Sequence, residues 1–438
     1  MMKTKEKQLK NQLILLNGEI PVDLPLNTFI SINRNSPEKV YGLGFQPAKS
    51  IPEIPRWFLQ KYLSKDSVIL EPFAGSGTTI IETLKYGYSI YWLDYNPLSK
   101  LICRVKTSFF DCIKAKKLSG KLICKSKKQK FHKDTVNFSN KEFWFQKPVI
   151  EMLEILKENI ILLDKNIQPL FWLAYSHTVR KVSNMNDSMI LAARRPNVAD
   201  VPKRTREDVL YYFENYLIRT INAIAEWNYM LNGNLKKANE VKYCDALELK
   251  GRWKCDAVIT SPPYINAIDY VWASKFELHW LGFVKSNEDR LDLYSKEIGT
   301  ERIPSKEFKE LGKTGYDYID KLLENIYVGK YYQASKGQNH LRARVVYKYF
   351  KDMKNHLISC YNKLNNKGYY CFTIGDFSMI CGVQIPVASL LSKIAQEIGY
   401  KEIFRFHLLL RNRKLNIPRN VDWANTIKYD TTIVLERN

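Results

Sequence analysis

Residues 260–264 read Thr-Ser-Pro-Pro-Tyr and place a hydroxyl, a stiff turn and an aromatic ring side by side in the sequence. They follow the apolar run 256–259, which predicts a buried strand. The paired prolines fix φ and lack N–H donors, so the strand must end in a rigid lip. A planar guest can stack on Tyr264 while its amino group donates to Ser261, which suits an enzyme that acts on an extruded nucleobase. By itself, the pentapeptide also fits an ordinary proline-stiffened loop.

A second candidate motif lies upstream, where the apolar run 67–70 precedes Glu-Pro-Phe-Ala-Gly-Ser-Gly-Thr-Thr at 71–79. A helical pattern follows through Ile80 and Leu84. Strand, glycine turn and helix together present backbone N–H groups at a helix N-terminus, which favours an anionic group such as a carboxylate or a phosphate. The next apolar run ends in Asp94, an acid placed to accept hydrogen bonds from ribose hydroxyls.

The simplest interpretation of this glycine turn is a tight turn that only packs a helix on a strand. Several ligands are also compatible with a turn of this kind. A nicotinamide-type fingerprint needs a third glycine where Ile80 stands. A phosphate-binding Walker loop needs Gly-Lys-Ser/Thr, which this motif lacks. A nucleoside with a carboxylate tail remains, and S-adenosylmethionine has both parts.

The two motifs, together with Asp-Tyr-Asn-Pro at 94–97, resemble the amino-methyltransferase family that modifies DNA. The resemblance implies an α/β fold of the class I S-adenosylmethionine-dependent type, with a Rossmann-like seven-stranded sheet, an antiparallel last strand and large, mostly helical insertions. Further segments resemble the family's first cofactor motif (46–49, with Gln46 where a histidine is common), its third motif (244–247), the continuation of its catalytic loop (264–270) and its later strands (368–375 and 411–418).

The resemblance also implies roles for individual residues. Asp94 is expected to hold the cofactor's ribose, Asp245 its adenine amino group, and Thr78 or Thr79 its carboxylate. The catalytic set is Ser261, Pro262, Pro263 and Tyr264, and the cofactor set is Glu71, Phe73, Gly75, Gly77, Thr78, Thr79, Asp94 and Asp245.

In this family a serine at the first catalytic position favours N4 of cytosine, whereas Asp or Asn favours N6 of adenine, which stays the alternative. Direct transfer needs neither a metal nor a covalent intermediate, and without a Pro-Cys dipeptide the chain lacks the nucleophile for methylation at a ring carbon. An RNA base methyltransferase would more often carry Asp or Asn before Pro-Pro-Tyr. An inactive DNA-binding subunit would not be expected to keep both motifs intact.

Composition favours a large folded protein with a polyanionic partner. The 438 residues are 45% hydrophobic and carry a net charge of +23, which argues for nucleic acid or an acidic surface as a partner, although a lysine-rich proteome explains part of the excess. The family resemblance implies that this partner is double-stranded DNA. The eight cysteines form no Cys-x-x-Cys pair, so we expect free thiols in a reducing compartment. The basic N-terminus has no long apolar segment after it, so we expect a cytoplasmic, DNA-associated protein without a membrane span.

Strands alternating with helices predict a parallel sheet whose carboxyl ends share one cleft, because Gly75, Asp94, Asp245 and Ser261 all follow predicted strands. The predicted strands are 67–70, 88–94, 241–244, 256–260, 368–374, 402–410 and 431–436.

We divide the chain into five parts: a cofactor-binding half of the core (40–108), a helical insertion (109–240), a catalytic half (241–285), a second insertion (286–346) and C-terminal strands (347–438). Long insertions are uncommon without a role, so one or both are expected to recognise DNA. A cognate restriction endonuclease is a further candidate partner. The candidate DNA contacts are Arg194, Arg195, Lys203, Arg204, Arg342 and Arg344.

Overall fold

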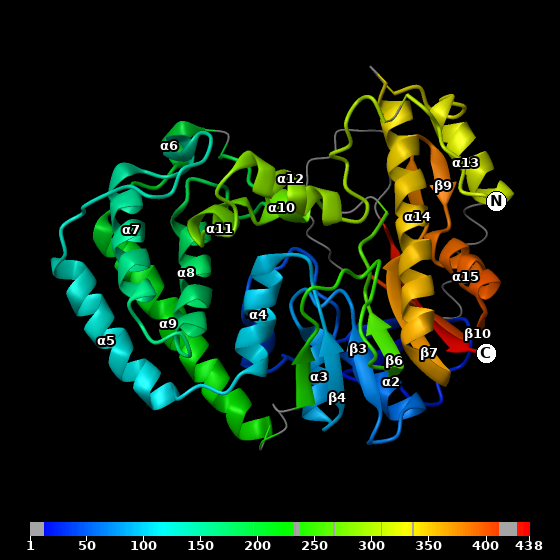
Figure 1. Ribbon diagram of the computed structural model, residues 1–438, viewed down its shortest axis with the longest axis horizontal. Helices are drawn as coiled ribbons and strands as arrows, with labels where there is room; N and C mark the ends of the chain where they lie inside the picture. The colour runs from blue at the N-terminus through cyan, green and yellow to red at the C-terminus, as the bar shows by residue number, and fades with distance from the viewer. Residues whose placement is uncertain are drawn as a thin grey trace.

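A nine-stranded sheet forms the core of the computed structural model, which describes residues 13–195, 197–231, 233, 237–265, 268–307, 309–334, 337–410 and 427–438 (Figure 1). The strand order is β1-β2-β10-β11-β7-β6-β3-β4-β5. All neighbours are parallel except for β11, which is antiparallel to both β7 and β10. The strands are β1 (Leu13–Asn17), β2 (Thr28–Asn33), β3 (Val68–Glu71), β4 (Ser89–Trp92), β5 (Ala238–Glu240), β6 (Cys255–Thr260), β7 (Leu364–Gly375), β10 (Tyr400–Leu409) and β11 (Tyr429–Arg437).

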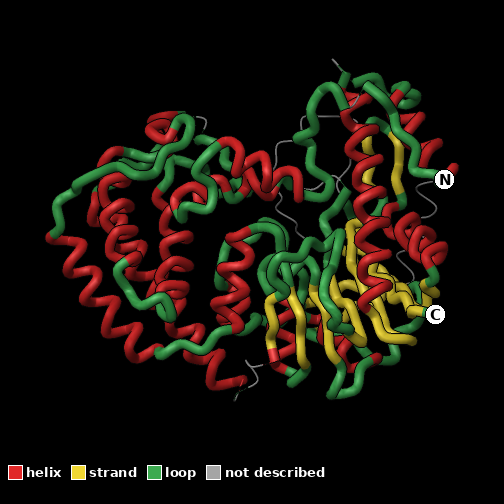
Figure 2. The backbone as a smooth tube through the Cα atoms, in the orientation of Figure 1, coloured by secondary structure: helices red, strands yellow, loops and turns green. Residues whose placement is uncertain are grey.

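Helices cover both faces of the sheet, as a buried parallel sheet requires (Figure 2). Neighbouring residues of β3 show the two faces, because Ile69 belongs to one apolar cluster and Leu70 to the other. The first cluster includes side chains of α2, α3 and α4, and the second includes side chains of α13, α14 and α15. These helices are α2 (Glu53–Tyr62), α3 (Thr78–Lys85), α4 (Pro97–Thr107), α13 (Asp317–Tyr327), α14 (Gln338–Lys363) and α15 (Val387–Ile398).

A group of helices between β4 and β5 packs beside the sheet, on the left of Figure 1. Its longest member, α9, contacts α5, α7 and α8, and also reaches α3 of the core. The group consists of α5 (Cys112–Lys128), α6 (Lys141–Trp144), α7 (Lys147–Ile161), α8 (Gln168–Val182) and α9 (Arg206–Leu231), with a 3-10 turn at Val198–Asp200.

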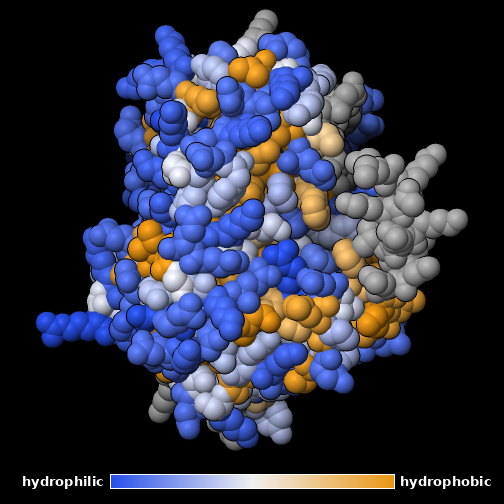
Figure 3. All heavy atoms as spheres, turned by 90° about the vertical axis from the view of Figure 1, so that its right-hand side faces the viewer, coloured by the Kyte–Doolittle hydropathy of each residue, from blue (hydrophilic) through white to orange (hydrophobic). Residues whose placement is uncertain are grey.

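Short helices follow β6 and lie above the sheet, between the helical group and α14 (Figure 1). They are α10 (Tyr270–Ala273), α11 (Lys275–Trp280) and α12 (Asn287–Lys296). A small hairpin of β8 (Ser378–Ile380) and β9 (Val383–Ile385) follows β7, and a 3-10 turn spans Lys39–Gly42. The side of the molecule that carries α13 and α15 is mostly hydrophilic, with scattered apolar side chains (Figure 3). No helix in the described parts of the chain has both the length and the apolar character needed to cross a membrane.

Two expectations about strands differ from the structure, and a third expected segment lies outside the described residues. The sheet has nine strands rather than seven, because residues 13–33 add β1 and β2 beside β10. The predicted strand 241–244 is wrong: β5 ends at Glu240, Val241 donates to Trp92 O, and the chain then turns through the fully exposed Tyr243 at φ 57°. The segment 411–418, which resembles a later part of the family, lies outside the described residues.

Candidate active site

One cavity of about 720 Å³ opens at the carboxyl ends of β3, β4 and β6, where ligands of open α/β sheets bind. Both sequence motifs line it, so the structure brings the glycine turn and the proline lip to one site. The predicted residues that line the cavity are Glu71, Phe73, Gly75, Thr78, Thr79, Asp94, Ser261, Pro262, Pro263 and Tyr264.

The glycine turn depends on backbone angles that suit glycine. Gly75 has φ +50° and Gly77 has φ +78°, both in the left-handed region that residues with a Cβ rarely adopt. Gly77 is the N-cap residue of α3 and does not line the cavity, so it shapes the turn rather than facing a ligand. At Gly75 an added Cβ would meet only Phe73 O, at 3.7 Å, so the backbone is open on that side.

Asp94 fixes the turn from the end of β4. Its Oδ2 accepts from Gly75 N at 2.7 Å, and its Oδ1 accepts from Asn96 N at 2.8 Å. Burial raises the pKa of Asp94 to about 6, although the two backbone amides act in the opposite direction. A carboxylate can accept about four hydrogen bonds, and Gly75 N, Asn96 N and the Ser99 side chain already donate to it, so Asp94 can still accept from a ligand hydroxyl.

Glu71 links the cofactor motif to the catalytic strand beneath the cavity. Its Oε1 accepts from Phe73 N at 3.0 Å and from Thr260 Oγ1 at 2.5 Å, so β3 and β6 share one buried carboxyl group. Burial raises the pKa of Glu71 to about 7, while the hydrogen bonds lower it. The carboxyl group therefore titrates near neutral pH.

The proline lip is held from behind by β7 and β11. Ser261 Oγ donates to Thr373 O at 3.2 Å, and Tyr264 OH donates to Asp430 Oδ1 at 2.8 Å. Gly375 pairs directly with Asp430 across the two strands. A Cβ at Gly375 would lie 2.5 Å from the Tyr264 ring, so only a glycine leaves room for that ring. The position of the tyrosine is thus set by two residues of the sheet.

Asp245 does not reach the cavity, in contrast to its expected role. It is exposed, and its Oδ1 accepts from Leu247 N at 2.9 Å within a turn. A turn stands where the strand 241–244 was expected, and that strand would have placed Asp245 at the shared cleft.

Most candidate DNA contacts are engaged within the protein. Arg194 lies 4.1 Å over the Phe143 ring, and Arg344 lies 4.7 Å over the Tyr347 ring. Lys203 is exposed. The remaining three have polar partners: Arg195 lies 3.8 Å from Asp187, Arg204 donates to Tyr212 OH at 3.1 Å, and Arg342 pairs with Glu301.

Several cavity residues carry no motif that sequence reasoning could have used. Met379 comes from the β8–β9 hairpin and Ile190 from the helical group. Asp430 directly precedes a predicted strand, yet nothing local distinguishes it from other acids. Lys49, in contrast, belongs to the segment 46–49 that resembles a cofactor motif; it lines the cavity and donates to Tyr41 O at 3.1 Å and to Gly44 O at 3.2 Å, and burial lowers its pKa.

The chain is similar to several curated methyltransferases. Type II methyltransferase M.MvaI of Kocuria varians is 23% identical over 435 residues, which cover 92% of this chain and 92% of that protein. The names of these relatives support methyl transfer. M.BsoBI of Geobacillus stearothermophilus is 24% identical, covering 81% of this chain and 76% of that protein, and M.MjaII of Methanocaldococcus jannaschii is 22% identical, covering 62% and 67%. No protein-family model matches the chain.

Proposed function

We propose that this protein transfers a methyl group from S-adenosylmethionine to the exocyclic N4 of a cytosine extruded from double-stranded DNA. The observation that carries the proposal is the shared cavity, where the turn at Gly75 and Asp94 faces the same space as Ser261 and Tyr264. The similarity to the Type II methyltransferase M.MvaI over 92% of the chain supports methyl transfer.

The residues of the cavity fit this cofactor. Its volume, about 720 Å³, lies within the range of ligand pockets. The open backbone at Gly75 and the start of α3 suit a carboxylate, and Asp94 keeps an acceptor position for a ribose hydroxyl. When bound, S-adenosylmethionine supplies a methyl group activated by a sulfonium. Thr78 and Thr79, in the first turn of α3, would lie at the carboxylate end.

The chain's own residues would prepare the base. The amine of cytosine is a poor nucleophile because its lone pair is conjugated with the ring. Ser261 donates its proton to Thr373 O, so the Oγ lone pairs are available to accept from that amine. A second acceptor at the Pro262 carbonyl would draw the nitrogen towards a pyramidal geometry. Tyr264, fixed by Asp430, would stack on the base and orient it, and orientation supplies much of the rate.

The choice of cytosine rests on Ser261. A neutral hydroxyl is a small acceptor, and the family resemblance associates serine at this position with N4 of cytosine. Double-stranded DNA as substrate agrees with the net charge of +23.

The test is expression in a bacterial host that lacks DNA methylation, followed by digestion of DNA and RNA to nucleosides and mass spectrometry. We expect N4-methylcytosine in the DNA. A Tyr264→Ala variant expressed in parallel should give none and controls for host enzymes. N6-methyladenine instead would overturn the choice of base, and methylation confined to RNA would overturn DNA as the substrate.

A further inference from the structure

Residues 184–195, named here the rim loop, connect the helical group to the cavity. The loop follows α8, and its residue Ile190 lines the cavity. Among the described residues between α4 and β5, Ile190 is the one that reaches the site. The rim loop therefore links the helical group to the candidate active site.

The rim loop has a defined fold of its own. Met185 and Arg194 form an antiparallel bridge, and Asn186 N donates to Ala193 O at 2.8 Å. Met189 N donates to Asn186 O at 3.0 Å, which closes the tip as a turn. The base of the loop is fixed to α6, because Asn184 N donates to Trp144 O at 2.8 Å.

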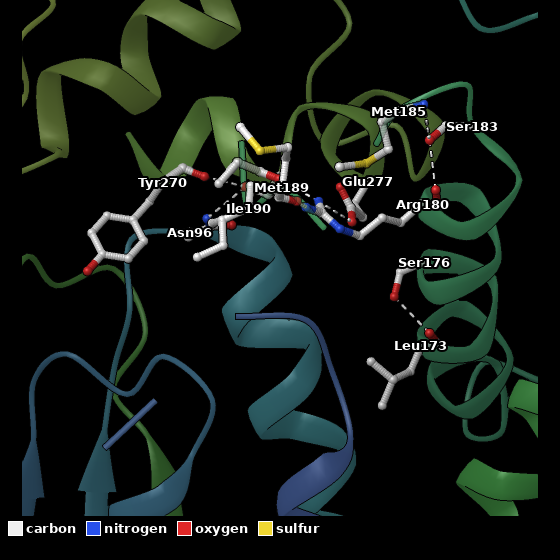
Figure 4. Close-up of polar contacts among 12 residues, drawn as sticks. Asn96, Leu173, Ser176, Arg180, Ser183, Met185, Met189, Ile190, Tyr270 and Glu277 are labelled. Atoms are coloured by element: carbon white, nitrogen blue, oxygen red, sulfur yellow. Dashed lines mark hydrogen bonds and ion pairs between the residues drawn. The ribbon is translucent and has the colours of Figure 1, made fainter. Parts of the chain in front are cut away.

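Arg180 of α8 anchors the tip to the catalytic side of the molecule. It donates to Ile190 O at 2.6 Å and to Ala273 O at 2.8 Å, and it lies 3.5 Å from Glu277. Figure 4 shows the tip between Tyr270 and the Arg180–Glu277 pair, close to Asn96. On its other side the guanidinium lies 3.5 Å over the Phe45 ring. These contacts hold the backbone of the tip in place.

The tip itself is apolar and partly exposed. Met189, Ile190 and Leu191 are each half-buried, and Ile190 lines the cavity. Arg194 and Arg195 follow the tip in the loop, where Arg194 lies over the Phe143 ring and Arg195 lies 3.8 Å from Asp187. A fixed apolar tip complements DNA at a disrupted step, where base faces become exposed.

We propose that the rim loop contacts the duplex at the target position, with Met189 and Ile190 packing against the base pairs that lose their neighbour when the target base is extruded. The inference rests on the proposed function and adds to it the surface that stabilises the opened duplex. Arg180 acts as a positioning residue for this contact.

The experiment compares two DNA substrates in single-turnover methylation, after the methylated position has been mapped in DNA from cells that express the wild-type protein. One duplex has the target base paired, and the other has an abasic position opposite it, so that extrusion costs less. The variant is Met189→Ala/Ile190→Ala, which keeps the carbonyl groups that bind Arg180. Ile161→Ala, at the exposed end of α7, is the matched control.

We expect the double variant to methylate the paired duplex at least about tenfold more slowly, and the abasic duplex within about twofold of the wild-type rate, because the rim loop acts on extrusion. The control should match the wild type on both. An equal loss on both substrates would make the loop a plain wall of the cavity, and no loss on either would remove it from the DNA contact; each result overturns the inference. If the wild type methylates no DNA, the proposed function has failed and the inference falls with it.

Discussion

Replacing Asp430 by alanine should slow catalysis without weakening cofactor binding, because it removes the hydrogen bond that supports Tyr264. The tyrosine donates to Asp430 Oδ1 at 2.8 Å, and Asp430 is 7% exposed. A hydrogen bond to a charged group contributes about 1.5–3 kcal/mol, and its loss leaves a buried hydroxyl to find another orientation. If half of that energy fixes the ring against the base, kcat falls by roughly 3–12-fold, at about 1.4 kcal/mol per tenfold.

The assay is a double-mutant cycle on kcat with Tyr264→Phe, Asp430→Ala and the double variant. Phenylalanine keeps the ring but removes the donor, so once it is present the aspartate can no longer hold the tyrosine hydroxyl. We therefore expect the double variant to be no slower than the slower single variant. Asp430→Asn keeps an acceptor oxygen and should retain most of the activity, while the KM for S-adenosylmethionine stays within about twofold in all variants.

Additive effects of the two substitutions would refute this reasoning, because they would mean that Asp430 acts on something other than the tyrosine. A rise in KM for the cofactor with unchanged kcat would refute it as well. Thermal unfolding of each variant separates a general loss of folded protein from the specific effect, since the fraction folded at the assay temperature can be measured directly.

Three further changes test the site. Gly375→Ala should lower kcat at least about tenfold with the fold retained by circular dichroism, because its Cβ would lie 2.5 Å from the Tyr264 ring; wild-type activity would contradict the packing described. Asp94→Ala should weaken cofactor binding, measured by calorimetry, about tenfold or more. The affinity of the wild type for the cofactor should decrease as the pH drops below about 6, where Asp94 gains a proton. Asp94→Asn should lack this pH dependence. Burial raises the pKa of Glu71 from 4.5 to about 7, so the folded state binds the proton more tightly and the free energy of unfolding should decrease as pH rises between those values. Urea unfolding of Glu71→Gln should show a shallower decrease, and an identical slope in both proteins would exclude Glu71 as its source.

The parts of the fold that follow from local sequence were the ones predicted well. The strands ending at Glu71 and Thr260 are short apolar runs closed by a glycine turn or by prolines, and such signals act within a few residues. The N-terminal strands β1 and β2 were missed because β1 is largely exposed at the edge of the sheet and shows no clean alternation. The strand expected at 241–244 failed because the pairing with β4 stops at Glu240.

The candidate site divides in the same way. Asp94 and Ser261 were found because each follows a predicted strand, and parallel strands bring their ends together. Asp430 could not be found, since its importance comes from lying opposite Gly375 in a pair of strands whose members are far apart in sequence. The arginines were predicted as DNA contacts because the sequence gives only their charge. It does not show that Arg194 lies over an aromatic ring or that Arg342 pairs with an acid.

The two sets of contacts around the cavity differ in what they can adjust. Ser261 and Tyr264 are held by Thr373 and Asp430, which belong to the buried, paired strands β7 and β11, so their positions depend on the sheet. The tip at Ile190 is held by Arg180, which also binds Ala273 O in α10, shortly after the catalytic loop. If DNA binding shifted the rim loop, Arg180 would therefore transmit the shift to α10. The hydrogen bonds that join Ser261 and Tyr264 to β7 and β11 would not change. Contact with DNA would then change the entry of the target base more readily than the positions of Ser261 and Tyr264. The abasic substrate should therefore report on base extrusion, and the Asp430 cycle on methyl transfer.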